Sequence, residues 1–173
     1  MRVNPYRVFG VVGAEPLHGG GAPRKRKKVM KVAKEGNNDA SGDGEDFAVV
    51  LIGHGSTLPY NKEVLEELGK RIEKRGIFKA VRVAFMQLNS PSIEEVLRTL
   101  AQEGMKNIVA LPVFLADGAH TKDDIPEKLK ISFEGDWEDL GRDIMLIYAK
   151  PIGVDERIVD ILLDRIKEAI EGG

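Results

Sequence analysis

The feature that most constrains this chain is a regular alternation of two patterns, which begins at Phe47. Residues 47–52 are apolar at every position and are followed by Gly53, which is typical of a strand buried on both faces of a sheet. The next segment carries apolar residues at helical spacing. The pair occurs four times, with strands expected over 47–52, 80–88, 107–116 and 144–149, and helices over 59–75, from Pro91 to near Gly104, and over 121–129 and 154–170.

This alternation requires a parallel sheet with helices on both faces. We therefore predict an α/β fold with a flavodoxin-like, four-stranded parallel sheet in the strand order 2-1-3-4. Ser90 is expected to cap the second helix, with Pro91 at its first position. Pro112 conflicts with the third strand, because proline lacks the N–H that a sheet ladder needs. The last helix is expected to pack on the sheet through Ile158, Ile161, Leu162, Ile166 and Ala169.

Residues 1–45 have a different composition from the rest of the chain. They carry nine Lys and Arg against five Asp and Glu, whereas the remaining 128 residues have a net charge of −6. A glycine run at 19–21, a basic run at 24–28 and a small, acidic stretch at 37–45 cannot bury enough apolar surface to offset the entropy of ordering. We predict a disordered, basic and glycine-rich extension over 1–45 and one folded domain over 46–173.

The sequence favours a cytoplasmic protein without membrane or nucleic-acid partners. Residues 8–14 are a poor fit to a signal peptide, because Gly10 and Gly13 interrupt the apolar run. No stretch approaches the ~18–20 apolar residues of a membrane helix. The acidic domain disfavours a broad nucleic-acid surface, although the basic run at 24–28 is compatible with an anionic partner.

Composition also restricts the chemistry. The chain has no cysteine, which excludes disulfides, thiolate zinc sites, iron–sulfur clusters and thiol catalysis. Ser56 does not lie in a serine-hydrolase elbow, because Leu58 occupies the final position of that motif. Neither a P-loop nor a dinucleotide-binding glycine motif is present. Any imidazole chemistry must come from only three histidines, which are His18, His54 and His120.

Two of these histidines follow neighbouring strands of the predicted sheet. His54 comes just after the first strand and His120 just after the third, so both lie at the switch point where ligands bind in such folds. Two imidazoles in one cleft suit cobalt, nickel or zinc. The alternative is that each is a loop histidine bonded only to backbone.

Small residues surround both histidines. Gly55 and Gly118 allow the backbone to approach a ligand closely, although turns use glycine for the same reason. Ser56, Ser90, Ser92 and Thr121 lie at or near helix starts, where free amides attract carboxylates or phosphates. Ordinary helix capping explains these four residues about as well.

Several motifs together carry a family resemblance. They are Gly53-His54-Gly55-Ser56, Pro112-Val113-Phe114-Leu115, Gly118-x-His120-Thr121-x-x-Asp124-Ile125-Pro126 and Pro151-Ile152-Gly153-x-Asp155-x-Arg157-Ile158-Val159-Asp160. In these motifs the segment from Phe47 to Ile170 resembles the small-form class II chelatases of archaea, the sirohydrochlorin cobaltochelatases and nickelochelatases.

The resemblance implies a chelatase-like fold and an enzyme that inserts Co²⁺ or Ni²⁺ into sirohydrochlorin with loss of two pyrrole protons, in cobalamin or coenzyme F430 biosynthesis. It implies no ATP, no cofactor beyond the metal inserted, and a homodimer with the active site between the protomers. His54 and His120 would be the catalytic and metal-handling residues. The residues expected near the substrate are Gly55, Ser56, Gln87, Ser90, Gly118 and Thr121.

One departure keeps alternatives open. Many relatives have a glutamate where this chain has Gln87, and an amide cannot ionise. A non-catalytic carrier of a tetrapyrrole or a metal is therefore one alternative. A flavodoxin-like protein that binds a phosphorylated ligand at the helix starts is another.

Overall fold

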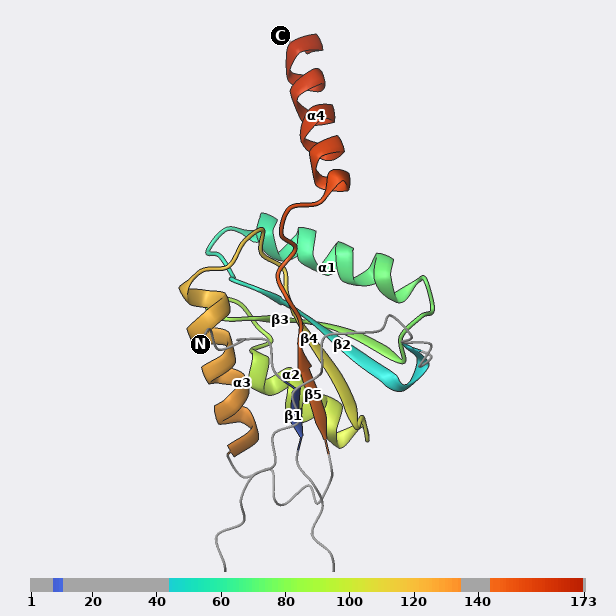
Figure 1. Cartoon of the computed structure of the whole chain (residues 1–173), viewed down its shortest axis with the longest axis vertical. Coiled ribbons are helices and arrows are strands. Elements are labelled where there is room, and N and C mark those ends of the chain that lie inside the picture. The colour runs from blue at the N-terminus through green and yellow to red at the C-terminus, as the bar shows by residue number, and fades with distance from the viewer. Residues whose placement is uncertain (1–7, 11–43, 135–143, 173) are drawn as a thin grey trace, which may run out of the picture.

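A computed structural model describes residues 8–10, 44–134 and 144–172 (Figure 1). The elements in chain order are β1 (Val8–Gly10), the 3-10 turn η1 (Gly44–Asp46), β2 (Phe47–Gly53), α1 (Pro59–Glu73), β3 (Ala80–Phe85), α2 (Ile93–Gln102), β4 (Asn107–Pro112), the π-helical turn η2 (His120–Asp124), α3 (Ile125–Glu134), β5 (Met145–Tyr148) and α4 (Glu156–Glu171). The predicted alternation of strands and helices is confirmed.

The sheet has the order β1-β5-β4-β2-β3. Strands β2 to β5 are parallel to one another, which confirms the predicted order for the four expected strands. Strand β1 was not predicted. It pairs antiparallel with β5, with Val8 opposite Ile147, so the expectation that nothing in residues 1–45 folds is wrong for these three residues. The basic run at 24–28 and His18 lie outside the described residues, and the domain boundary at 45/46 stays a prediction.

Helices cover both faces of the sheet. Side chains of α2 and α3 pack with alternate residues of β2, β4 and β5 in the larger core cluster, in which Leu97, Ile125 and Leu146 are fully buried. Helix α1 covers the other face through Leu65, which packs with Leu51 and Phe85. The apolar run of β2 is therefore explained by its place in the middle of the sheet, with a helix on each side.

The structure resolves the conflict at Pro112 and moves the start of α2. Strand β4 ends at Pro112, which pairs with Ile52 of β2, whereas the pairing of β4 with β5 ends at Ala110. The Val113 N–H donates to the Ile52 carbonyl, so the nitrogen of Pro112 faces the β5 side, where the ladder has already ended. The cap of α2 is Ser92 rather than the predicted Ser90. Its hydroxyl accepts from the Glu95 N–H while the Glu95 carboxylate accepts from the Ser92 N–H, and this capping box outweighs the Ser-Pro signal.

Two other expectations change at the C-terminal side. Helix α3 runs to Glu134, three residues into the stretch 132–142 that we expected to be irregular; residues 135–143 lie outside the described residues. Helix α4 forms as predicted, but none of its residues is buried. It projects from the sheet instead of packing on it, so the predicted inner face is wrong for this conformation of the chain (Figure 1). Of the helices that the structure describes, none is long and apolar enough to cross a membrane.

Candidate metal-handling site

His54 lies in the loop after β2, where its ring is held from both sides. Its Nδ1 atom lies 2.9 Å from the carbonyl oxygen of Gly55. Because a carbonyl oxygen only accepts, Nδ1 carries the proton and Nε2 keeps the lone pair. The Nε2 atom lies 2.9 Å from Nε2 of Gln87, so the amide donates to the nitrogen that would bind a metal.

His120 is the first residue of η2 and is fixed by a carboxylate. Its Nδ1 atom lies 2.6 Å from Oδ2 of Asp124, one turn further along the chain. A carboxylate that holds Nδ1–H fixes the tautomer and directs the Nε2 lone pair away from Asp124. The His120 side chain is 49% exposed, so the ring is partly accessible to solvent.

The fold brings these two rings into contact. Their centroids lie 4.9 Å apart at an interplanar angle of 64°, although the residues are far apart in the sequence. The contact confirms that the loops after β2 and β4 meet at one edge of the sheet, because those strands are direct neighbours. Each ring uses Nδ1 for positioning, so both Nε2 atoms lie at this edge. The lone pair of His54 Nε2 accepts from the Gln87 amide, which an incoming metal would have to displace.

The donor set suits a metal that passes through rather than one that stays. Structural metal sites usually have four protein ligands, and resident catalytic metals usually have three. Within the part of the chain that the structure describes, no group of three or more His, Asp or Glu side chains is arranged to hold a metal. Imidazole nitrogens suit cobalt, nickel and zinc. The pair can therefore receive such an ion and still leave most of its coordination positions to another ligand.

The loop after β3 clamps the His54 loop. The Met86 N–H donates to the Gly53 carbonyl over 2.9 Å, and the Gln87 N–H donates to the His54 carbonyl over 3.2 Å. Gly55 is required here because it has a φ of +92°, and a Cβ atom would lie 1.8 Å from the Gln87 carbonyl oxygen. Gln87 and Ser90 are exposed on this loop, so both remain available to a ligand.

Ser56 and Asn89 form a further hydrogen bond between the same two loops. The Ser56 N–H donates to Asn89 Oδ1 over 2.7 Å, and the Ser56 hydroxyl accepts from the Leu58 N–H over 3.1 Å. The helix-start amide that we expected to hold a substrate carboxylate is therefore already bonded within the protein. Asn89 was missed at the sequence level, because nothing in a single sequence marks an amide that bonds a residue 33 positions away.

Thr121 is a positioning residue in this structure. It is 1% exposed, its hydroxyl donates to the Gly118 carbonyl and accepts from the Gly118 N–H, and its own carbonyl accepts from the Tyr148 hydroxyl over 2.9 Å. These bonds anchor the turn that presents His120. Gly118 is exposed with open space around it, so it is the member of this turn that a ligand can approach.

Asp124 was part of the motif that carried the resemblance, but we assigned it no role. Its position four residues after His120 was the signal for this contact, because residues four apart are neighbours on one side of a helix.

An α/β fold with two imidazoles in contact at its switch point suits a class of protein that brings a small ligand and a divalent metal together. Comparison with known protein families identifies one family. The CbiX family model matches residues 48–169, and the chain therefore belongs to the CbiX family.

Two relatives are informative. The sirohydrochlorin cobaltochelatase of Methanopyrus kandleri is 41% identical over 140 residues, covering 71% of this chain and 96% of the relative. That of Methanosarcina acetivorans is 41% identical over 132 residues, covering 73% and 98%. The predicted resemblance to small class II chelatases is confirmed.

Solved structures confirm the fold. The sirohydrochlorin chelatase SirB from Bacillus subtilis subspecies spizizenii, in complex with cobalt, has a TM-score of 0.63 and 26% identity, covering 70% of this chain and 50% of that one. A CbiX protein from Marinobacter aquaeolei, described as a putative cobalamin biosynthesis protein, has a TM-score of 0.58 and 24% identity, covering 73% and 99%. The chelatase-like fold is therefore confirmed.

Proposed function

We propose that this protein is a sirohydrochlorin chelatase that inserts Co²⁺ into the macrocycle. The observation that carries the proposal is the His54–His120 contact, with both Nε2 lone pairs at the carboxyl edge of the sheet, in a chain 41% identical to sirohydrochlorin cobaltochelatases. The metal is a substrate here, which agrees with a donor set too small to retain it. Ni²⁺ is the alternative metal, because imidazole ligands suit both ions.

The reaction balances without another reactant. Two pyrrole N–H bonds break, bonds form between the metal and the macrocycle nitrogens, and two protons leave. An imidazole that has passed its metal to the macrocycle regains a free lone pair, which can accept a departing proton. The balanced reaction contains no ATP and no cofactor beyond the metal inserted, in line with what the resemblance implies.

The residues proposed to contact the substrate lie on the loops that clamp the histidines. Gln87, Ser90 and Gly118 are exposed and can approach the macrocycle or its carboxylates. Gly55 and Ser56 shape the floor of the site, and Thr121 acts by holding the His120 turn.

We further propose that the enzyme is a homodimer with its active site between the protomers. One copy offers two histidines on an open edge, and a facing copy would add two more. The 50% coverage of the longer B. subtilis chelatase supports this proposal, because two copies of the matched segment, which is 70% of this chain, have about the length of that one. The expected cytoplasmic location remains a prediction.

Steady-state kinetics test the proposal. Purified protein is mixed with sirohydrochlorin and either Co²⁺ or Ni²⁺, and insertion is followed through the visible spectrum of the macrocycle. We expect insertion faster than in the protein-free control, over many turnovers. An insertion rate equal to that of the protein-free control would refute the proposal that the protein is an enzyme.

A carrier is the second candidate, favoured by the hydrogen bond from Gln87 to the His54 Nε2 atom. A carrier would bind the macrocycle or the metal stoichiometrically and would not raise the insertion rate. The same kinetics separate the two functions. Binding of a phosphate ester without any dependence on metal would favour the phospho-ligand alternative instead.

A further inference from the structure

Helix α4 has an apolar face that is exposed in the part of the chain that the structure describes. Large side chains line one side of it over its whole length, and they are Ile158, Val159, Leu162, Leu163, Ile166 and Ile170. Ile166 is 54% exposed and Ile170 is 75% exposed. Such a stripe is normally buried against a sheet or another helix. Among the residues that the structure describes, none provides that cover.

The sheet face on which α1 packs is only partly covered by the helices that the structure describes. On the side that α1 covers, Val109 and Leu111 of β4 are only half-buried, as is Ile147 of β5 beside Val109. The opposite face of the same strands is fully buried under α2 and α3. Val64 and Leu68 of α1, which we expected on its inner face, are 60% and 42% exposed. We name this surface, Val64, Leu68, Val109, Leu111 and Ile147, the receiving face.

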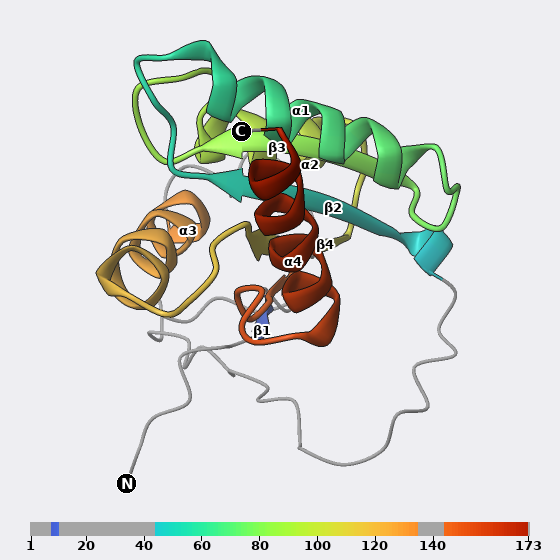
Figure 2. The ribbon, with the colours of Figure 1, turned by 90° about the horizontal axis from the view of Figure 1, so that it is seen from above.

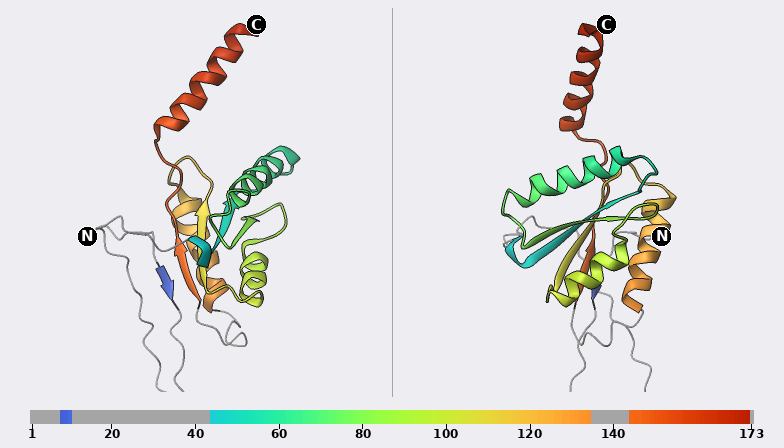
Figure 3. Two further views of the ribbon diagram at one scale, coloured as in Figure 1. Left: turned by 90° about the vertical axis from the view of Figure 1, so that its right-hand side faces the viewer. Right: turned by 180° about the vertical axis from the view of Figure 1, so that it is seen from behind.

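The chain directs α4 away from its own receiving face. The linker after β5 is fixed to the loop after β4, because the Ile152 and Gly153 N–H groups donate to the carbonyls of Phe114 and Leu115, each over 2.9 Å. Helix α4 starts at Glu156, beyond this anchor, and extends past the end of the sheet (Figures 1 and 3). Viewed from above, it stands over that end (Figure 2). To pack on its own sheet, the chain would have to reverse direction between this anchor and the start of α4.

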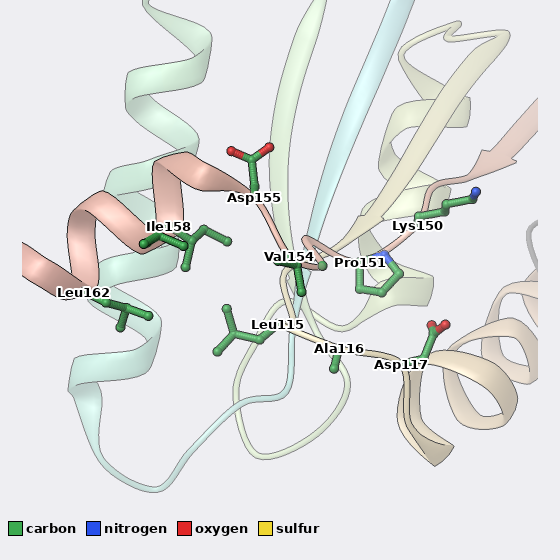
Figure 4. A pocket seen from close by; sticks show the side chains of 11 residues that line it. Leu115, Ala116, Asp117, Lys150, Pro151, Val154, Asp155, Ile158 and Leu162 are labelled. Carbon is green, nitrogen blue, oxygen red and sulfur yellow. The ribbon is translucent and has the colours of Figure 1, made fainter.

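A hollow of about 630 Å³ opens where α4 leaves the body. Leu115 lies on one side of it, Ile158 and Leu162 lie on the other, and Val154 at its rim is fully exposed (Figure 4). The loop on the Leu115 side continues through Asp117 to His120. The base of the helix is therefore continuous with the edge that carries the metal-handling site.

We propose that two copies of this chain exchange their α4 helices, so that the apolar stripe of each packs on the receiving face of the other. This inference rests on the homodimer of the proposed function and specifies how it is held together. Since α4 leaves from the edge that carries the histidines, the exchange requires the two carboxyl edges to face each other. It therefore places both His54–His120 pairs at one interface.

The size of the surfaces agrees with a stable dimer. A standard interface buries about 800 Å² on each partner and uses about 20–30 residues a side. Each copy contributes a 16-residue helix, which is about 24 Å long, together with a receiving face and the hollow at its base. The same patches serve on both copies, so the contact closes with two-fold symmetry and does not extend into a fibre.

The absence of cysteine in the chain makes a direct test possible. One chain carries Ile166→Cys on the apolar stripe, and a second chain of distinguishable mass carries Leu68→Cys on the receiving face. The two full-length chains are co-expressed and treated with a short bis-maleimide. We expect a cross-linked heterodimer. Asp164→Cys, on the polar side of α4, is the matched control and should give several-fold less product.

Other outcomes would overturn the exchange. With both cysteines in one chain, a cross-link that stays within a monomer shows that α4 docks on its own body. A second pair, Leu162→Cys with Leu111→Cys, is tested in the same way, and circular dichroism checks that all variants are folded. The exchange is also refuted if neither pair gives a cross-link. Chelatase activity is measured separately on the unmodified chain, so a cross-linked dimer without activity refutes the function and leaves the exchange standing.

Discussion

At the residue scale, each imidazole is oriented by a partner on its Nδ1 atom, and this arrangement makes Asp124 testable. Asp124→Ala removes the acceptor that holds His120 and should lower Co²⁺ affinity or insertion rate by about 10–100-fold, as loss of such carboxylates does at other histidine metal sites. Asp123→Ala, at the exposed neighbour, should leave both unchanged. Titration calorimetry with Co²⁺ and insertion kinetics measure the two effects. Equal behaviour of the two variants would refute the positioning role.

Gly55 is the residue where the backbone itself limits substitution. In Gly55→Ala the new methyl group meets the Gln87 carbonyl at 1.8 Å and the residue must keep a positive φ, so the clamp between the two loops has to open. We expect a loss of about 2–4 kcal/mol in the free energy of unfolding, measured with urea. Gly118→Ala has open space and should change stability by no more than about 0.5 kcal/mol. A Gly55→Ala protein as stable as the parent would contradict the geometry.

At the element scale, the start of α2 shows what local sequence decides. The capping box of Ser92 and Glu95 fixes the helix start, so Ser92→Ala should cost about 1 kcal/mol of folding stability, measured with urea, while Ser90→Ala should cost much less. If Ser90→Ala lost more stability than Ser92→Ala, the helix would start at Ser90, as the sequence predicted.

The same cap gives a pH dependence. The hydrogen bonds from Ser92 lower the pKa of Glu95 below its ordinary value of 4.5. A lowered carboxyl pKa contributes stability that is present above 4.5 and is lost as the pH falls through the pKa of the folded state. Glu95→Ala should therefore be less stable than the parent at neutral pH, and the difference should close as the pH falls below 4.5. Urea unfolding over that range measures it, and a gap that widens in acid would contradict the cap.

Elements were predictable from the sequence to the extent that their signals are local. Apolar runs such as that of β2 and helical spacing such as that in α1 located four strands and four helices. The bonds that finish the site are not local. Asn89 reaches Ser56 across two loops, and Tyr148 reaches the Thr121 carbonyl from another strand, so neither could be inferred from spacing.

At the scale of the whole molecule, the sequence predicted the strand order and therefore the meeting of His54 and His120, because parallel topology fixes which strand ends share an edge. It did not predict the partner of α4. Apolar periodicity shows that Leu162 and Ile166 need cover, but the same pattern serves a helix that packs on its own sheet and one that packs on another copy. Strand β1 was missed for a related reason, since three residues give too short a pattern to separate an edge strand from a tail.

The central claim is that the paired Nε2 atoms of His54 and His120 carry the metal into sirohydrochlorin. The most direct measurement compares the initial rate of Co²⁺ insertion in the parent protein with that in His54→Ala and His120→Ala, each confirmed by circular dichroism to be folded. The account predicts that either substitution reduces the rate to that of the uncatalysed reaction. Insertion at the parent rate in both variants would contradict it.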